Sequence, residues 1–106
     1  MYVRRVIDTE AELIRALCAD YERRAEALIS GRLSHATEMQ YKYLNYKIYD
    51  AAAETVGEAL AEIYVKEIGF STGYADTRVE AVSETTYKRD KKRVREAIAR
   101  KLNLSS

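Results

Sequence analysis

The basic side chains of this chain gather near its C-terminal end. Residues 88–106 carry eight basic and two acidic side chains, a net charge of +6, whereas residues 1–87 carry ten basic and fifteen acidic ones, a net charge of −5. Most globular surfaces intersperse their charges, and a concentrated positive charge attracts polyanions. The segregation therefore predicts a segment that binds nucleic acid. The rival interpretation is a basic helix face that is only solvated.

The start of this segment has the residue types of a DNA recognition helix. Ser83 is suited to cap a helix N-terminus, because its hydroxyl can accept a hydrogen bond from a free backbone N–H. Short polar residues and a basic pair follow, so the first exposed side chains could meet base edges while the helix end faces phosphate. We expect a helix from Ser83 to Asn103. Its inward face should consist of Tyr87, Val94, Ile98 and Leu102.

The outward positions of this helix have expected roles in binding double-stranded DNA. Base readout should come from Glu84, Thr85, Lys88 and Arg89. Phosphate contacts position a protein without reading the sequence. They should come from Lys91, Lys92, Arg93 and Arg95. Of these residues, Lys91 occupies an inward-facing position of the predicted helix.

A first long helix is predicted near the N-terminus. Thr9 and Glu12 have the spacing of a capping box, in which each side chain bonds a free backbone N–H of the other. Apolar residues with helical periodicity then continue for more than two heptads. The helix should end at Ser30, because Gly31 supplies a C-terminal stop.

A second long helix should follow after a short link. It begins near Ser34 or Thr37 and runs to Ile68, where Gly69 ends it. Gly57 lies inside this helix at a cost of roughly 1 kcal/mol relative to alanine. We expect it to mark a bend or to permit close approach of a neighbouring helix.

These elements define the expected architecture. The chain has no proline and four glycines, which favours long helices joined by short links. Residues 71–82 are less regular and could hold one short helix from Tyr74 to Val79. We expect an all-α fold in a single domain, residues 1–106. A long αα-hairpin over residues 8–69 should precede a helix-turn-helix-like pair over residues 71–103.

Four tyrosines in the second helix cannot all share one helical face. They are Tyr41, Tyr43, Tyr46 and Tyr49. Tyrosines on a second face would fit a homodimer interface, where an apolar ring and a wet hydroxyl are both accommodated. The alternative is that they cover other helices of the same chain.

Other classes of function are not expected. No stretch approaches the ~18 consecutive apolar residues that span a bilayer, and a lone Cys18 suggests the reducing cytoplasm. Cys18 and His35 lack the further ligands that structural zinc needs. Glu58 and Glu62 form a carboxylate pair four residues apart that no His or Cys supports as a catalytic centre, and no nucleophile motif occurs. We expect no enzyme, metal, cofactor, membrane or small-molecule substrate.

The segment from Val82 to Leu102 resembles the C-terminal helix of small phage-encoded transcriptional regulators of the ArpU/RinA type. The preceding Ile63–Phe70 pattern is also similar to that family. The resemblance implies a helix-turn-helix fold like the promoter-reading domain of sigma factors. It also implies duplex DNA as the ligand and a role in phage or prophage transcription. The main alternative is a helical phage assembly or packaging component that reads no DNA sequence, and a basic helix on an anionic membrane surface ranks last.

Overall fold

The computed structural model describes residues 2–104, with side chains from residue 9 onward. Residue 1 and residues 105 and 106, the ends of the predicted domain, lie outside the described residues. The described chain is all-α and contains no strand, as predicted. Its elements are α1 (Tyr2–Ala19), α2 (Tyr21–Ser30), α3 (His35–Val56), α4 (Glu58–Gly69), the 3-10 helix η1 (Tyr74–Asp76) and α5 (Glu84–Lys101). No helix in this part of the chain has the length and apolar character needed to cross a membrane.

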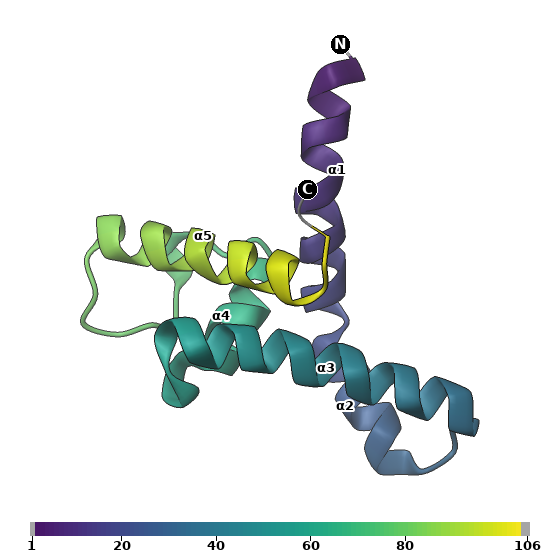
Figure 1. Ribbon diagram of the computed structural model, residues 1–106. Helices are drawn as coiled ribbons and strands as arrows, with labels where there is room; N and C mark the ends of the chain where they lie inside the picture. Colours follow the sequence, from purple (N-terminus) through teal and green to yellow (C-terminus); the bar gives the residue numbers. More distant parts are fainter. Residues whose placement is uncertain (1, 105–106) are drawn as a thin grey trace.

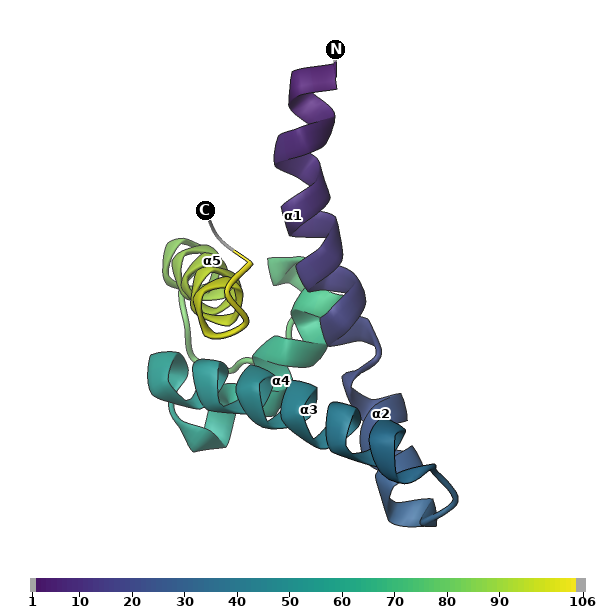
Figure 2. The ribbon, with the colours of Figure 1, turned by 45° about the vertical axis from the view of Figure 1, so that its right-hand side comes forward.

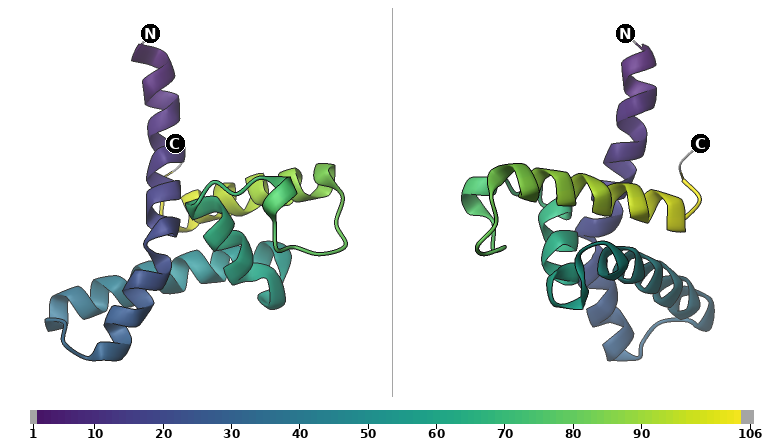
Figure 3. Two further views of the ribbon diagram at one scale, coloured as in Figure 1. Left: turned by 180° about the vertical axis from the view of Figure 1, so that it is seen from behind. Right: turned by 60° about the vertical axis from the view of Figure 1, so that its left-hand side comes forward.

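The helices cross one another around a small core. Helices α3 and α5 lie side by side and run in opposite directions, and α4 packs against both of them (Figure 1). Helix α1 packs on α4 through its C-terminal half, while its N-terminal half extends away from the other helices (Figure 2). Helices α2 and α3 form a short hairpin that projects from the opposite end of α1 (Figure 2). The C-terminal half of α1 therefore lies beside the end of α5, as the views in Figure 3 also show.

The core is built from apolar side chains on four helices, and those of α5 are the ones that the periodicity predicted. Its fully buried large side chains come from four helices: Ile14 and Cys18 of α1, Ile48 of α3, Tyr64 and Val65 of α4, and Tyr87, Val94 and Ile98 of α5. Burying each such side chain contributes roughly 1.5–3 kcal/mol. Alanines at the centre of α3 and α4, such as Ala51 and Ala61, are also completely buried and allow the helix axes to come close.

The predicted first helix differs from the structure both in where it begins and in how far it continues without a break. Helix α1 already begins at Tyr2, so Thr9 lies inside it and the predicted capping box with Glu12 is wrong. No proline or glycine precedes Thr9, so nothing in residues 2–8 stops a helix from extending upstream. The predicted continuous helix to Ser30 is also wrong, because it breaks at Asp20 into α1 and α2.

A buried polar cluster stabilises this break. The Arg24 guanidinium donates from Nη2 to the Leu17 carbonyl over 2.6 Å and from Nε to Asn45 Oδ1 over 2.7 Å. Asn45 Nδ2 in turn donates to the Tyr21 carbonyl over 3.0 Å. Backbone carbonyls beside the break are thereby satisfied by side chains, as burial requires. Burial lowers the pKa of Arg24, and its charge is solvated by these oxygens.

The predicted second helix is likewise two helices, α3 and α4, that meet at Gly57. Ser34 caps α3, because its Oγ accepts a hydrogen bond from the backbone N–H of Thr37. Gly57 has φ +90°, a left-handed conformation that favours glycine, and a Cβ there would meet no atom within 4 Å. Of the two roles predicted for Gly57, the bend is therefore correct and close helix approach is not.

Close approach occurs instead at Gly69, the last residue of α4. A Cβ at this position would lie 2.5 Å from the backbone nitrogen of Ala19 and 2.7 Å from its Cα. Only a residue without a side chain allows the end of α4 to cross α1 at this distance. The sequence predicted a helix stop here, but the steric reason lies in α1, fifty residues away in the chain.

The link between α4 and α5 is more extended than predicted. The expected helix from Tyr74 to Val79 is confined to η1, Tyr74–Asp76, and residues 77–83 contain no helix. Ser71 and Ala81 adopt positive φ values of 55° and 57°. A first helix packed next to a tight turn, as in a helix-turn-helix motif, is therefore not found within residues 71–82.

We predict that Gly69→Ala destabilises the protein by about 1–3 kcal/mol, the usual range for overpacking a core. The methyl group would be forced against the α1 backbone, which cannot move as a side chain can. Urea unfolding followed by circular dichroism measures the change. Gly73→Ala is the matched control, because a Cβ there meets nothing within 4 Å and the residue has a φ of −88°. Equal stability of the two variants would contradict the steric role of Gly69.

Candidate nucleic-acid interface

Helix α5 begins where the sequence predicted. The Ser83 hydroxyl accepts a hydrogen bond from the backbone N–H of Thr86 over 3.1 Å, which caps the helix. The helix ends at Lys101, and Asn103 follows with a φ of 58°. Its first turn lies at one edge of the molecule, next to the 77–83 link and away from α1 (Figure 1). The start of α5 is therefore placed where a large partner could reach it.

The inward and outward faces of α5 are also largely as predicted. Tyr87, Val94 and Ile98 are buried, while Leu102 is half-buried. The exposed members of the predicted DNA-binding set are Glu84, Thr85, Lys88, Arg89, Lys92, Arg93 and Arg95. Arg100 is exposed as well. Six basic side chains thus lie on the solvent side of one capped helix.

Lys91 is placed differently from the other predicted contacts. It is half-buried, and its Nζ donates to the Thr72 carbonyl over 2.6 Å while lying 5.7 Å from the centre of the Tyr87 ring. Burial lowers the pKa of Lys91, and the nearby Arg95 lowers it further. Its first role is to hold the 70–83 link against α5.

Part of the positive charge is paired within α5 itself. Lys88 lies 2.8 Å from Glu84, and Arg89 and Arg93 lie 3.4 and 3.5 Å from Asp90. The basic side chains of these pairs are more than half exposed, and such surface pairs contribute little and exchange readily for other partners. Lys92 and Arg95 form no ion pair with any described residue.

The two long edges of α5 differ in charge. On the edge toward α3, Lys101 bonds Asp50 over 2.7 Å and Glu54 over 3.1 Å. A shallow hollow on that edge is lined by two carboxylates, Glu54 and Glu96, as well as by Arg93 and Arg100. Acidic groups therefore offset the basic ones beside α3. The opposite edge, which faces α1, has fewer acidic neighbours.

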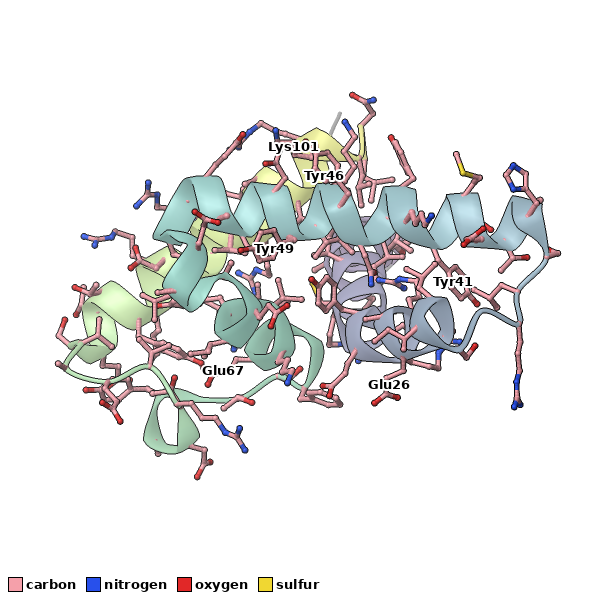
Figure 4. All side chains as sticks on the ribbon, turned by 90° about the horizontal axis from the view of Figure 1, so that it is seen from below. Glu26, Tyr41, Tyr46, Tyr49, Glu67 and Lys101 are labelled. Atoms are coloured by element: carbon pink, nitrogen blue, oxygen red, sulfur yellow. The ribbon has the colours of Figure 1, made fainter. Side chains whose placement is uncertain are left out.

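The buried carboxylate of Glu67, in α4, fixes the position of the start of α5. Glu67 of α4 is only 5% exposed and accepts hydrogen bonds from Tyr87 Oη over 2.7 Å, Thr77 Oγ1 over 2.6 Å and the backbone N–H of Arg78 over 2.7 Å. The label in Figure 4 places Glu67 between α4 and the link. Such charge-assisted bonds are the stronger ones in proteins. Burial, and then the bond to Glu67, raises the pKa of Tyr87 to about 12.

The sequence reasoning missed Glu67. Within α4, the only indication that Glu67 is buried is its position three residues after Tyr64, beside the apolar face of the helix. The Tyr64 ring stacks on the Tyr87 ring with 5.8 Å between their centres, so this same face meets the start of α5. The three bond donors to Glu67 all come from later parts of the chain, which no pattern in α4 specifies.

The four tyrosines of α3 divide between the two roles considered for them. Tyr41 and Tyr49 are half-buried and lie on the side of α3 that covers α2 and α4 (Figure 4). Tyr43 and Tyr46 are 50% and 64% exposed, and Met39 beside them is 54% exposed. Two tyrosines therefore cover helices of the same chain, and two remain on an exposed face.

The residues weighed as possible metal ligands or nucleophiles lie far from this surface. Cys18 is buried in the core, and burial raises the pKa of its thiol to about 12. His35 is exposed at the start of α3. Within residues 9–104 no three His, Cys, Asp or Glu side chains are grouped in a way that could hold a metal ion.

Comparison with known proteins adds no family to this description. No family model, curated protein or solved structure matches the chain. The surface of α5 is therefore interpreted from its own geometry and charge.

We predict that Tyr87→Phe lowers the free energy of unfolding by about 1.5–3 kcal/mol, because a hydrogen bond to a buried carboxylate is lost. Tyr43→Phe is the control, since its ring is half exposed, and it should change stability by less than about 0.5 kcal/mol. Chemical denaturation measures both.

Because the pKa of Tyr87 is raised to about 12 in the folded protein, its protonated hydroxyl stabilises the fold below about pH 10, and this contribution is lost as the pH rises toward about 12. Wild type should therefore lose stability relative to Tyr87→Phe over that interval, and a constant difference would contradict the role of the hydroxyl.

Proposed function

We propose that this chain is a DNA-binding protein that contacts double-stranded DNA with α5. The observation that carries the proposal is the row of six exposed basic side chains on a helix whose capped N-terminus lies at the edge of the molecule. Counterion release from DNA favours binding by such a row at moderate salt. The basic side chains that are paired within α5 are more than half exposed and can exchange their carboxylate partners for phosphate oxygens.

The first two turns of α5 are assigned to base readout. An α-helix fits the major groove of B-DNA, and arginine can donate two hydrogen bonds to guanine there. Thr85, Lys88 and Arg89 are exposed at this end of the helix, next to Glu84. Lys92, Arg93 and Arg95 then meet the phosphates that flank the groove. Lys91 acts mainly by keeping the 70–83 link in place.

The proposed recognition helix does not follow the tight turn of a helix-turn-helix motif. Residues 70–83 separate α4 from α5, whereas that motif has a turn of about three to four residues. The support for α5 comes from Glu67, Tyr87 and Thr72 instead. We propose transcription regulation, in a phage or prophage setting, as the biological role, because the sequence of α5 resembles regulators of that kind.

We further propose that the protein acts as a homodimer through the exposed face of α3. Met39, Tyr43 and Tyr46 lie one turn apart on the side of α3 that no other described element covers. Aromatic residues and methionine are enriched at such interfaces. A dimer would present two copies of α5, so that two half-sites could be bound together.

Replacing Arg89 by Ala should cost about 1–3 kcal/mol on the preferred DNA sequence and much less on random duplex. Arg100→Ala is the matched control, because Arg100 lies at the far end of α5 and should weaken both duplexes equally and slightly. Enrichment from a random duplex pool first supplies the preferred sequence, and fluorescence anisotropy then measures affinity. If no sequence enriches, or if both variants behave alike on every duplex, a structural or packaging role replaces sequence-specific regulation.

In sedimentation equilibrium at micromolar concentration the 12.1 kDa chain should have the mass of a dimer. Tyr46→Glu should shift it toward monomer, because a carboxylate on the exposed α3 face would have to be desolvated on pairing. Phe70→Glu places the same charge on an exposed aromatic position outside α3 and should leave the mass unchanged. A wild-type monomer at high concentration would rule out paired half-sites but not binding by α5.

A further inference from the structure

A hollow of about 250 Å³ lies between α1, the end of α4 and α5. Basic side chains from two different helices line it: Arg15 from α1, and Lys91 and Arg95 from α5. Glu12 is its acidic member, and Ser71 lies at the end toward α4. The hollow therefore adds a residue of α1 to the basic surface of α5, at the edge of α5 that faces away from α3.

The positive charge in this hollow is not neutralised within the described chain. Neither Arg15 nor Arg95 forms an ion pair with a described residue, and Glu12 forms none either. Lys91 is bonded to a neutral carbonyl, that of Thr72, so its charge also remains. Burial lowers the pKa of Lys91, the like charge of Arg95 lowers it further, and the carboxylate of Glu67 acts in the opposite direction.

The two walls of the hollow are held in place by the core. Ile14 and Cys18, on either side of Arg15 in α1, are buried against the other helices. The contact of Gly69 with Ala19 fixes where α1 crosses α4. Val94, the residue before Arg95, is buried in the core and anchors that turn of α5. Arg15 and Arg95 therefore extend from rigid helices, so little backbone ordering would oppose the binding of an anion between them.

We infer that this hollow binds a phosphate group of the DNA backbone, contacted by the guanidinium groups of Arg15 and Arg95. The inference rests on the proposed function, and it extends the DNA path from α5 across to α1. Guanidinium groups match the oxygens of a phosphate in planar, paired hydrogen bonds. The contact carries no base information, so its loss weakens binding to every duplex alike.

The test compares Arg15→Gln with Arg32→Gln, which removes the same charge from an exposed arginine in the α2–α3 turn. Loss of one phosphate contact should weaken duplex binding about 8-fold at 0.1 M salt and should reduce the log–log salt slope by about 0.9. Arg32→Gln should leave both quantities unchanged. Arg95→Gln is a second variant that removes the other guanidinium, and circular dichroism confirms that each variant is folded.

Inorganic phosphate is the second probe, because it reports on the hollow without DNA. Titration should shift the Nε–Hε NMR signals of Arg15 and Arg95 and leave that of Arg32 in place. If wild type binds duplex and Arg15→Gln behaves like Arg32→Gln, the hollow is not a contact and this inference is overturned while the proposed function stands. If wild type binds no duplex but phosphate shifts both signals, the hollow is an anion site and the proposed function is overturned.

Discussion

The carboxylate of Glu67 is the constraint on which the placement of α5 depends. A buried charge is tolerated only when donors surround it, and here the donors come from Tyr87 at the start of α5 and from residues 77 and 78 of the link. Without these bonds the later part of the link, residues 77 and 78, would lose its hydrogen bonds to α4, and the first turns of α5 would lose one of their supports. The Tyr64 and Tyr74 rings on either side of Tyr87 complete that support, with ring centres 5.8 Å from it in both cases.

A second constraint, between α1 and α4, shapes the other side of the molecule. The end of α4 can approach α1 only because Gly69 has no side chain. The break at Asp20, held open by Arg24 and Asn45, then turns α2 away so that it pairs with α3 (Figure 2). The crossing and the break together leave the C-terminal half of α1 beside α5. The helix crossing at Gly69 and the helix break at Asp20 thus determine which charged side chains lie on the same surface.

The sequence predicted those features that local chemistry specifies. The caps at Ser34 and Ser83, the bend at Gly57 and the buried faces of α3 and α5 all follow from residue type and spacing. The break at Asp20 could not be predicted, because Arg24 is held at the Leu17 carbonyl, and the Tyr21 carbonyl is bonded, by Asn45 in another helix. The role of Gly69 was missed for the same reason, since the atoms it would meet belong to α1. Of the candidate site, the exposed positions of α5 followed from helical periodicity. The inward position of Lys91 also followed from periodicity, but its bond to Thr72 and the place of Arg15 beside α5 did not, because tertiary contacts create them.

The ion pairs of Lys101 with Asp50 and Glu54 also have an effect at a distance. The acidic groups offset the basic ones on this flank of α5, while the hollow beside α1 holds an excess of positive charge on the other. The charges are therefore distributed unequally between the two flanks of α5. A polyanion would exert a torque on this unequal distribution and would favour approach by the α1 flank. The torque acts over roughly one Debye length, about 10 Å at 0.1 M salt. Orientation at encounter is thus determined by the arrangement of charges across α5, and a net charge of only +1 does not reveal it.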